Sequence, residues 1–308
     1  MDVVVSLIKL IASLSLLVVF GERLIDSSAR LARAFGISSA VIGLTVLAYG
    51  TSLPEFAVSS IAAAKQHSDI AVANIIGSNI YNIAVILGIA SIISSFIIKE
   101  SIIAKRDGIV MLVATAFLIV LAYTGKIERI AGVAMAAFII FYTYRILKHD
   151  RANNGIDPDG TISRVREAAL VAVLLAGVLV SGNFTVTSAV DLARSAGVSE
   201  WVIGATIVAA GTSLPETVVS IIAAKRGDFG MSVGNIVGSN TFNILWILGF
   251  ASVLNPLTIN FSEIYIDLIF LSVITILFYF GLYRRRLTMK EGVLYIAIYL
   301  GYIFYLVR

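Results

Sequence analysis

The sequence predicts an all-α protein that crosses a membrane many times. Of its 308 residues 59% are hydrophobic and 14% are charged, whereas a soluble domain carries about 25% charged residues. The apolar residues form continuous blocks that approach the ~17–25 residues a helix needs to cross a bilayer. Such blocks are too continuous for the alternating strands of a membrane β-barrel. An internal repeat further indicates that the helices form two related sets.

Ten spans follow from the apolar blocks. We expect helices over residues 3–22, 38–64, 70–95, 107–124, 129–147, 165–184, 199–224, 230–254, 263–283 and 290–307. The first block follows Met1-Asp2 without the basic segment or cleavage site of a signal peptide, so it is interpreted as a membrane span. A polar connector divides the chain into residues 1–148, a cytoplasmic linker at 149–163, and residues 164–308.

Positive charges predict the orientation of these spans in the lipid bilayer. With the N-terminus outside, 17 of the 23 Lys and Arg residues fall in cytoplasmic loops and 5 fall on the external side, while Lys9 lies in the first span. Because cytoplasmic loops are enriched in Lys and Arg, both termini are expected to be extracellular. The net charge of +4 is dispersed among apolar spans, which argues against nucleic acid as a partner. We expect a multi-pass protein of the plasma membrane that functions as a monomer.

A repeat relates the two halves of the chain. A shift of 161 residues places Val41–Ser91 on Val202–Ser252 without gaps, and 29 of the 51 positions are identical. The motif G-T-S-L-P-E and the motif G-S-N-x-x-N-I each occur twice, at Gly50–Glu55 and Gly211–Glu216, and at Gly77–Ile83 and Gly238–Ile244. Five spans separate equivalent positions, so the second copy crosses the membrane upside down. Inverted repeats with discontinuous helices at the midplane are typical of secondary transporters.

Two acidic residues, Glu55 and Glu216, fall near the middle of predicted spans and at equivalent repeat positions. A charge at the bilayer centre costs at least ~2.5–3.5 kcal/mol, and no Lys or Arg is predicted at the same depth. Either both carboxyl groups are protonated, or a cation binds between them. Pro54 and Pro215 precede the glutamates, and a proline inside a helix frees backbone carbonyls that can line a cavity or bind ions.

Helical spacing adds further oxygen atoms to this pair of carboxylates. Residues three or four positions apart share a helix face, which groups Thr51 and Ser52 with Glu55, Thr212 and Ser213 with Glu216, Ser78 with Asn82, and Ser239 with Asn243. Oxygen ligands suit Ca2+ and Na+, whereas the absence of cysteine and of intramembrane histidine disfavours Zn2+ and Cu+. The set lacks nucleophile–base pairs and phosphate loops, so neither enzyme chemistry nor a cofactor is expected.

The doubled motifs resemble the two alpha-repeats of the cation/Ca2+ antiporter superfamily, in its Na+/Ca2+ exchanger branch. The resemblance implies exchange of Na+ for Ca2+ by alternating access, in which spans one and six slide past the other eight. It implies that Glu55 and Glu216 are the central Ca2+ ligands and also contact Na+. The other implied ion contacts are the backbone carbonyls of Thr51 and Thr212, flanking Na+ sites at Ser52, Ser78, Ser213 and Ser239 with the backbone of Ala48 and Ala209, and Asn82 and Asn243 along the central cavity.

One residue departs from the family pattern. Many exchangers have Asp where this chain has Asn243, so only two carboxylates remain to balance one Ca2+. Three bound Na+ would leave excess positive charge, which predicts electrogenic exchange, and Asn243 argues against K+ co-transport. An H+/Ca2+ antiporter is the nearest alternative, although that branch usually carries G-N-x-x-E. A cation channel is a more distant one, because it should show a continuous pore, and inverted repeats with a pair of buried acids fit occluded, alternating sites better. A receptor or membrane scaffold would leave the buried glutamates unexplained.

Overall fold

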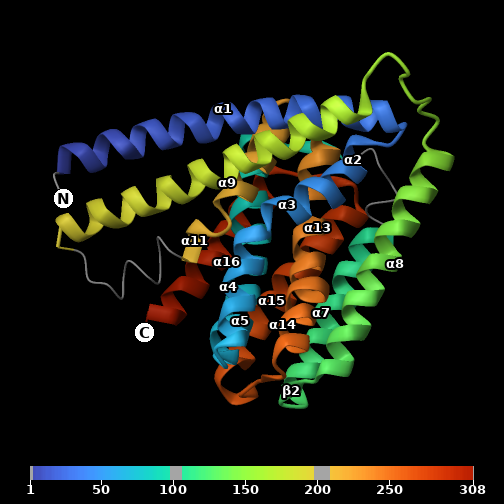
Figure 1. The fold of residues 1–308 in the computed structure, drawn as a ribbon. Coiled ribbons are helices and arrows are strands. Elements are labelled where there is room, and N and C mark those ends of the chain that lie inside the picture. Colours follow the sequence, from blue (N-terminus) through green and yellow to red (C-terminus); the bar gives the residue numbers. More distant parts are fainter. Residues whose placement is uncertain (1–2, 98–105, 198–208, 308) are drawn as a thin grey trace.

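The computed structural model describes residues 3–97, 106–197 and 209–307, and two long helices lie across a bundle formed by the others (Figure 1). The long helices, α1 (Val3–Phe35) and α9 (Arg164–Ser195), run side by side in opposite directions. They have 33 and 32 residues, so they extend well beyond the predicted spans 3–22 and 165–184. At 1.5 Å per residue each is about 50 Å long, more than the ~30 Å hydrocarbon core, and must tilt or project from it.

Helix α1 continues beyond the apolar segment from which its end was predicted, and the residue that ends it is Gly36. Leu24, Ile25 and Leu31 continue its buried face, so the amphipathic pattern persists after the mean hydropathy falls. Gly36 then has φ +63°, a left-handed conformation that commonly ends helices and that glycine adopts without steric cost. The predicted end at residue 22 was therefore wrong, since hydropathy measures contact with lipid and not the length of the helix.

The connector that follows α8 (Arg129–Asn153) packs against the end of α1. Asn154 Nδ2 donates to the Gly36 carbonyl at 3.1 Å, the Asp159 amide to the Arg33 carbonyl at 3.0 Å, and Arg164 Nε to the Ala34 carbonyl at 2.9 Å. These donors satisfy carbonyls that the last turn of a helix leaves without intrahelical partners. Within the connector, hydrogen bonds from the side chain and backbone of Thr161 lower the pKa of Asp159.

The central helices are broken in both halves. In the first half they are α2 (Ser39–Ile42), the π-helix η1 (Gly43–Leu47), α3 (Ala48–Thr51) and α4 (Leu53–Ala64), followed by α5 (Ser68–Tyr81), the π-helix η2 (Asn82–Leu87) and α6 (Gly88–Ile93). In the second half the described elements are α11 (Ala209–Gly211), α12 (Leu214–Lys225), α13 (Phe229–Phe242), the π-helix η5 (Asn243–Leu248) and α14 (Gly249–Leu254). Segments of π-helix are rare in proteins, and those that do occur often lie at functional sites.

Four further helices surround the broken ones, namely α7 (Gly108–Tyr123), α8 (Arg129–Asn153), α15 (Phe261–Tyr283) and α16 (Met289–Val307). Two short antiparallel ladders connect the halves of the chain. Strand β1 (Phe96–Ile97) pairs with β4 (Arg286–Leu287), with Phe96 opposite Leu287, and β2 (Lys126–Ile127) pairs with β3 (Leu257–Thr258), with Lys126 opposite Thr258.

The fold is an all-helical, polytopic membrane fold. In the described ranges seven helices are long and apolar enough to cross a membrane, and the number is eight if Ser39–Thr51 and Leu53–Ala64, which meet at 46°, are counted as one bent span. The predicted span 107–124 corresponds to α7, an apolar helix of 16 residues. The predicted span 199–224 begins in residues outside the described ranges, and α11 and α12 cover the remainder.

Glycines bring α13 into backbone contact with the first broken helix. A Cβ atom added at Gly238 would lie 2.3 Å from the Leu44 carbonyl oxygen, and one at Gly43 would lie 2.4 Å from that of Met231. Real Cβ atoms do not approach other atoms so closely, so these positions accept only glycine without a backbone shift. The halves therefore meet along helices whose axes approach closely, as small residues permit in membrane proteins.

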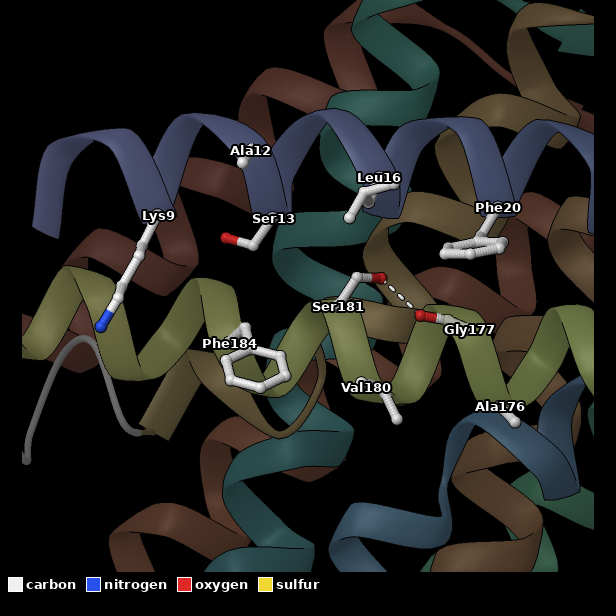
Figure 2. Close-up of a pocket in the computed structure, with 10 residues that line it drawn as sticks. All are labelled: Lys9, Ala12, Ser13, Leu16, Phe20, Ala176, Gly177, Val180, Ser181 and Phe184. Carbon is white, nitrogen blue, oxygen red and sulfur yellow. Dashed lines mark hydrogen bonds between the residues drawn. The ribbon is translucent and has the colours of Figure 1, made fainter. Parts of the chain in front are cut away.

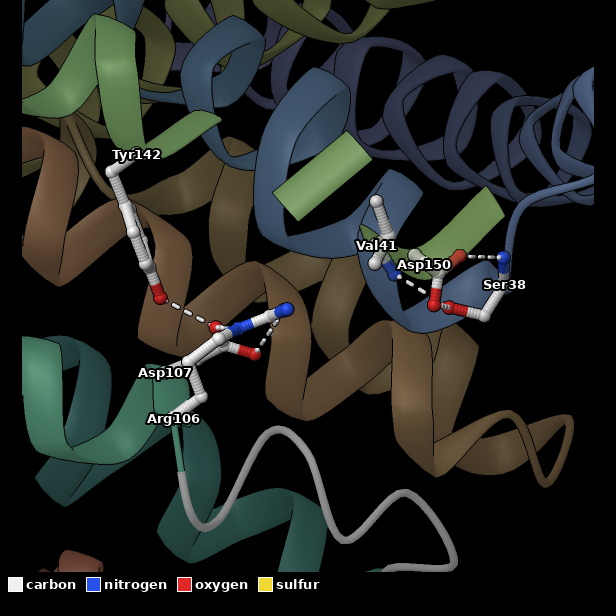
Figure 3. A network of polar contacts seen from close by, with 6 residues as sticks. All are labelled: Ser38, Val41, Arg106, Asp107, Tyr142 and Asp150. Carbon is white, nitrogen blue, oxygen red and sulfur yellow. Dashed lines mark hydrogen bonds and ion pairs between the residues drawn. The ribbon is translucent and has the colours of Figure 1, made fainter. Parts of the chain in front are cut away.

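Two aspartates anchor the ends of neighbouring helices to α8 (Figure 3). Asp150 accepts hydrogen bonds from the Ser38 amide at 2.7 Å and from the Ser38 hydroxyl at 3.0 Å, which fixes the start of α2. Asp107, at the start of α7, accepts from Arg106 Nε at 2.7 Å and from the Tyr142 hydroxyl at 2.5 Å. Both carboxylates are buried, so these contacts join three helices through groups shielded from solvent.

We expect Asp150→Ala to lower the thermal unfolding midpoint of the purified protein. The half-buried Ser38 amide and hydroxyl would lose their acceptor, and a typical intramolecular hydrogen bond contributes about 0.5–1.5 kcal/mol to stability. The matched control is Asp157→Ala, which removes an exposed carboxylate from the following connector. Equal unfolding midpoints for the two variants in the same detergent would contradict this role of Asp150.

Candidate functional site

The two predicted intramembrane glutamates meet at the centre of the bundle. Glu55 lies in the first turn of α4 and Glu216 in the first turn of α12, and each residue is 1% exposed. The Ser213 hydroxyl donates to Glu55 Oε1 and the Ser52 hydroxyl donates to Glu216 Oε1, both at 2.9 Å. Each carboxylate thus receives its hydrogen bond from the other half of the chain, which makes the pair a joint feature of both halves.

Breaks in the two helices create this crossed arrangement. Ser52 and Ser213 have ψ values of 11° and 13° and lie between the helical segments on either side. Pro54 and Pro215 occupy the first turns of α4 and α12, where a missing amide proton removes no intrahelical bond. The sequence grouped Ser52 with Glu55 and Ser213 with Glu216, and the serine hydrogen bonds run to the glutamate of the other half.

Helix polarity stabilises the buried carboxylates. Both glutamates lie at the N-terminus of a 12-residue helix, where unpaired amide groups and the helix dipole favour negative charge. The crossed serine contacts also bring the two carboxylates to one site, where two ionised carboxylates would repel one another. In the described part of the chain neither glutamate forms an ion pair with Lys or Arg, so the protein itself does not neutralise this negative charge.

Several buried oxygen atoms of the two motifs have no hydrogen-bond donor among the described residues. These buried atoms are Glu55 Oε2, Glu216 Oε2, Asn82 Oδ1, Asn243 Oδ1 and Thr212 Oγ1. A buried polar atom without a partner costs free energy, and here the carboxylate and amide oxygens recur at equivalent positions of the two motifs. Oxygen atoms of this kind are the ligands that hard cations such as Ca2+ accept.

Three of the other predicted residues lie beside the glutamates. Ser78 and Thr212 lie beside Glu55, and Thr51 lies beside Glu216. The Ser239 hydroxyl donates to the Ala48 carbonyl at 3.3 Å, and the Thr51 hydroxyl donates to the Leu47 carbonyl at 3.0 Å. Ala209 begins α11. The structure therefore places Thr51, Ser78 and Thr212 beside the two glutamates and Ser239 against the main chain of Ala48.

The sequence reasoning missed Asn79 and Asn240. Each lies three residues before a predicted asparagine in the G-S-N-x-x-N motif. Asn82 Nδ2 donates to Asn240 Oδ1 and Asn243 Nδ2 donates to Asn79 Oδ1, both at 3.0 Å. The signal was their presence in both copies of the motif, but only the assembled halves reveal what these side chains contact.

A separate groove lies between α1 and α9 (Figure 2). It encloses about 500 Å³ and is lined by Lys9, Ala12, Ser13, Leu16, Phe20, Ala176, Gly177, Val180, Ser181 and Phe184. Its lining includes neither glutamate nor any other predicted ion ligand. The groove belongs to the contact between the long helices, so the carboxylate centre is the better candidate for ion chemistry.

Comparison with known proteins identifies the family. The model of the family described as "Sodium/calcium exchanger protein" matches residues 5–148 and 167–308. The chain belongs to the sodium/calcium exchanger family. The resemblance drawn from the doubled motifs is thus confirmed, and the family is one of membrane transporters.

Relatives and solved structures match this exchanger-family chain over nearly its whole length. The inner membrane protein YrbG of Escherichia coli is 33% identical and covers 92% of the chain and 90% of its own length. The sodium/calcium exchanger MaX1 of Methanosarcina acetivorans is 27% identical, with 98% of each chain covered. A structure of the sodium-calcium exchanger NCX_Mj soaked with Na+ and Sr2+ has a TM-score of 0.87, with 32% identity and 98% of each chain covered.

Proposed function

We propose that this chain is a secondary active antiporter that exchanges Na+ for Ca2+ across the membrane by alternating access. The observation that carries the proposal is the pair of buried carboxylates, Glu55 and Glu216, whose Oε2 atoms have no hydrogen-bond donor among the described residues. A cation bound between them would neutralise the charge and coordinate those oxygens. Two carboxylates carry the charge that one Ca2+ balances.

The proposed ion ligands are the predicted ones. Glu55 and Glu216 would bind Ca2+ and contact Na+, with backbone carbonyls of Thr51 and Thr212 completing the Ca2+ site. The flanking Na+ sites would use Ser52, Ser78, Ser213 and Ser239 with the backbone of Ala48 and Ala209, and Asn82 and Asn243 would line the cavity. The burial of the described side chains in this set, apart from the half-buried Thr212, and the crossed serine contacts support this assignment.

We also propose ten spans in two inverted sets of five, residues 1–148 and 164–308, with residues 149–163 as a cytoplasmic linker. Contacts between the halves support this topology. The β1–β4 ladder joins two loops that the positive charges assign to the cytoplasm, and the β2–β3 ladder joins two loops assigned to the outside. The same orientation gives extracellular termini in a plasma membrane. We expect one chain to suffice, since a single chain supplies the whole proposed ligand set.

The arrangement of α1 and α9 suggests how access would alternate. The Thr185 hydroxyl donates to the Ser13 hydroxyl at 3.0 Å, which connects the two long helices so that they could slide together. Arg226, at the end of α12, forms an ion pair with Asp26 on α1. Sliding of α1 past the bundle would have to break this contact, so it would stabilise one of the two conformations.

The decisive experiment is uptake of radioactive Ca2+ into proteoliposomes. We expect uptake when the vesicles are loaded with Na+ and diluted into Na+-free buffer. If three Na+ leave for each Ca2+ that enters, one positive charge leaves per cycle, so an interior-positive potential should accelerate uptake. That potential can be set with valinomycin and a higher K+ concentration outside than inside.

The same assay distinguishes the other candidate functions. Uptake driven by a pH gradient without Na+ would identify an H+/Ca2+ antiporter. Ca2+ flux without any counter-gradient would identify a channel. Uptake that does not respond to the membrane potential would contradict electrogenic exchange while leaving Na+/Ca2+ exchange intact. Vesicles without protein provide the baseline for each condition.

A further inference from the structure

Four asparagines form a crossed hydrogen-bond network between the two halves. Asn79 Nδ2 donates to the Asn240 carbonyl at 3.1 Å, and Asn240 Nδ2 donates to the Asn79 carbonyl at 3.2 Å. Asn243 Nδ2 then donates to Asn79 Oδ1, and Asn82 Nδ2 donates to Asn240 Oδ1, both at 3.0 Å. All four residues are at most 1% exposed, so water has little access to compete for these bonds.

Donor and acceptor rules fix which way each amide points. The main-chain carbonyls of Asn79 and Asn240 can only accept, so the side chain facing each of them must present Nδ2. The Oδ1 atoms of Asn79 and Asn240 are then the atoms that face Asn243 and Asn82, and these two must present Nδ2 in turn. If the side-chain amide of Asn82 or Asn243 were reversed, its Oδ1 would face the Oδ1 of Asn240 or Asn79. Two acceptors cannot form a hydrogen bond, so the network selects one orientation of each amide.

The outcome is that the oxygens of Asn82 and Asn243 remain free. Both Oδ1 atoms are buried and have no donor among the described residues. The π-helix η2, which begins at Asn82, packs against α12, and η5, which begins at Asn243, packs against α4. These are the two helices that carry Glu216 and Glu55 in their first turns. The free amide oxygens thus belong to helices in contact with the carboxylate centre.

We propose that Asn79 and Asn240 are positioning residues that hold the amide oxygens of Asn243 and Asn82 toward the transported cation. This inference rests on the proposed cation transport and adds residues that would set Ca2+ affinity without touching the ion. A reversed amide would direct its N–H groups at the cation and repel it. An Asp at position 243 could not donate to Asn79 Oδ1, so this orienting contact depends on the asparagine that this chain carries.

A double-mutant cycle tests this role through the Ca2+ concentration for half-maximal uptake. We expect Asn79→Ala to raise that concentration about tenfold, as loss of an outer-shell partner typically does at metal sites. In an Asn243→Ala background the same change should have less than about a twofold effect, because there is no amide left to orient. An equal effect of Asn79→Ala in both backgrounds would overturn the proposal.

Asn79→Asp separates positioning from structural support. Like Asn79→Ala, it removes the donor to the Asn240 carbonyl, but it keeps an acceptor for Asn243. We expect half-maximal uptake at a Ca2+ concentration near that of the wild type, and an Asn79→Asp defect as large as that of Asn79→Ala would overturn the proposal. The added charge could itself attract Ca2+, so this variant is also measured with Asn243→Ala, where the charge effect alone remains.

The crossed symmetry supplies a second cycle. If Asn79→Ala lacks a cooperative thermal transition, Asn240→Ala is combined with Asn82→Ala and judged by the same criteria. Ca2+-induced thermal stabilisation of the purified variants gives a readout that does not depend on transport. An absence of Na+-driven uptake by the wild type would overturn the proposed function, whereas normal wild-type uptake with additive cycles would overturn only the positioning role.

Discussion

Glu55→Gln or Glu216→Gln is expected to abolish Na+-driven Ca2+ uptake while the protein still folds. Removing one carboxylate would leave a bound Ca2+ with one unneutralised charge. At membrane depth such a charge costs about 2.5–3.5 kcal/mol, which corresponds to a loss of about a hundredfold in affinity. The measurements are radioactive Ca2+ uptake into proteoliposomes and the rise in unfolding temperature that Ca2+ causes in detergent, and both should disappear.

In the absence of Na+ and Ca2+, Glu55→Gln or Glu216→Gln should not lower the thermal unfolding midpoint. Each Gln would remove repulsion between two buried carboxylates, so its unfolding midpoint without Na+ and Ca2+ should equal or exceed that of the wild type. The matched control is Glu128→Gln, which removes an exposed carboxylate that pairs with Lys126, and it should transport normally. Wild-type uptake by either glutamate variant would remove the proposed site.

Gly238→Ala is expected to lower both thermal stability and transport. The new Cβ would lie 2.3 Å from the Leu44 carbonyl oxygen and 2.7 Å from Ala48 Cβ, so α13 would have to move away from η1 and α3. Overpacking of this kind costs about 1–3 kcal/mol. The shift would also displace Ser239, whose hydroxyl contacts the Ala48 carbonyl. Unfolding midpoint and Ca2+ uptake rate are the two measurements.

Gly301→Ala makes the same chemical change where there is room for it. In the described ranges no atom lies within 4 Å of the Cβ that alanine would add in α16. This variant should keep wild-type uptake and gain slightly in stability, since alanine favours a helix over glycine by about 0.8–1.0 kcal/mol. If Gly238→Ala behaved like Gly301→Ala, close helix contact would not be what requires glycine at position 238.

The sequence predicted the centre of the molecule better than its edges. Glu55 and Glu216 could be paired from sequence because a charge in an apolar span is conspicuous and the repeat provides its counterpart. The serine contacts could not be predicted in the same way, because helical spacing describes neighbours within one helix. Ser52 and Ser213 each contact the glutamate of the other half, and that geometry exists only after two broken helices are packed together.

Two other features depend on information that hydropathy does not contain. The length of α1 is set by its buried face and by the backbone conformation of Gly36, neither of which hydropathy measures. Asn79 and Asn240 resemble ordinary polar packing residues when a single helix is considered. The role of their side-chain amides becomes clear only in the assembled structure, where each donates to the main-chain carbonyl of the other and so presents its Oδ1 to the next asparagine.

The crossed serine contacts have a consequence for how the chain is put together. Since Ser213 donates to Glu55 and Ser52 donates to Glu216, neither half of the chain forms the carboxylate centre by itself. Either half expressed alone would leave its glutamate without the serine donor that it has in the whole protein. Because both halves belong to one polypeptide, each glutamate always has its serine donor available in the same molecule.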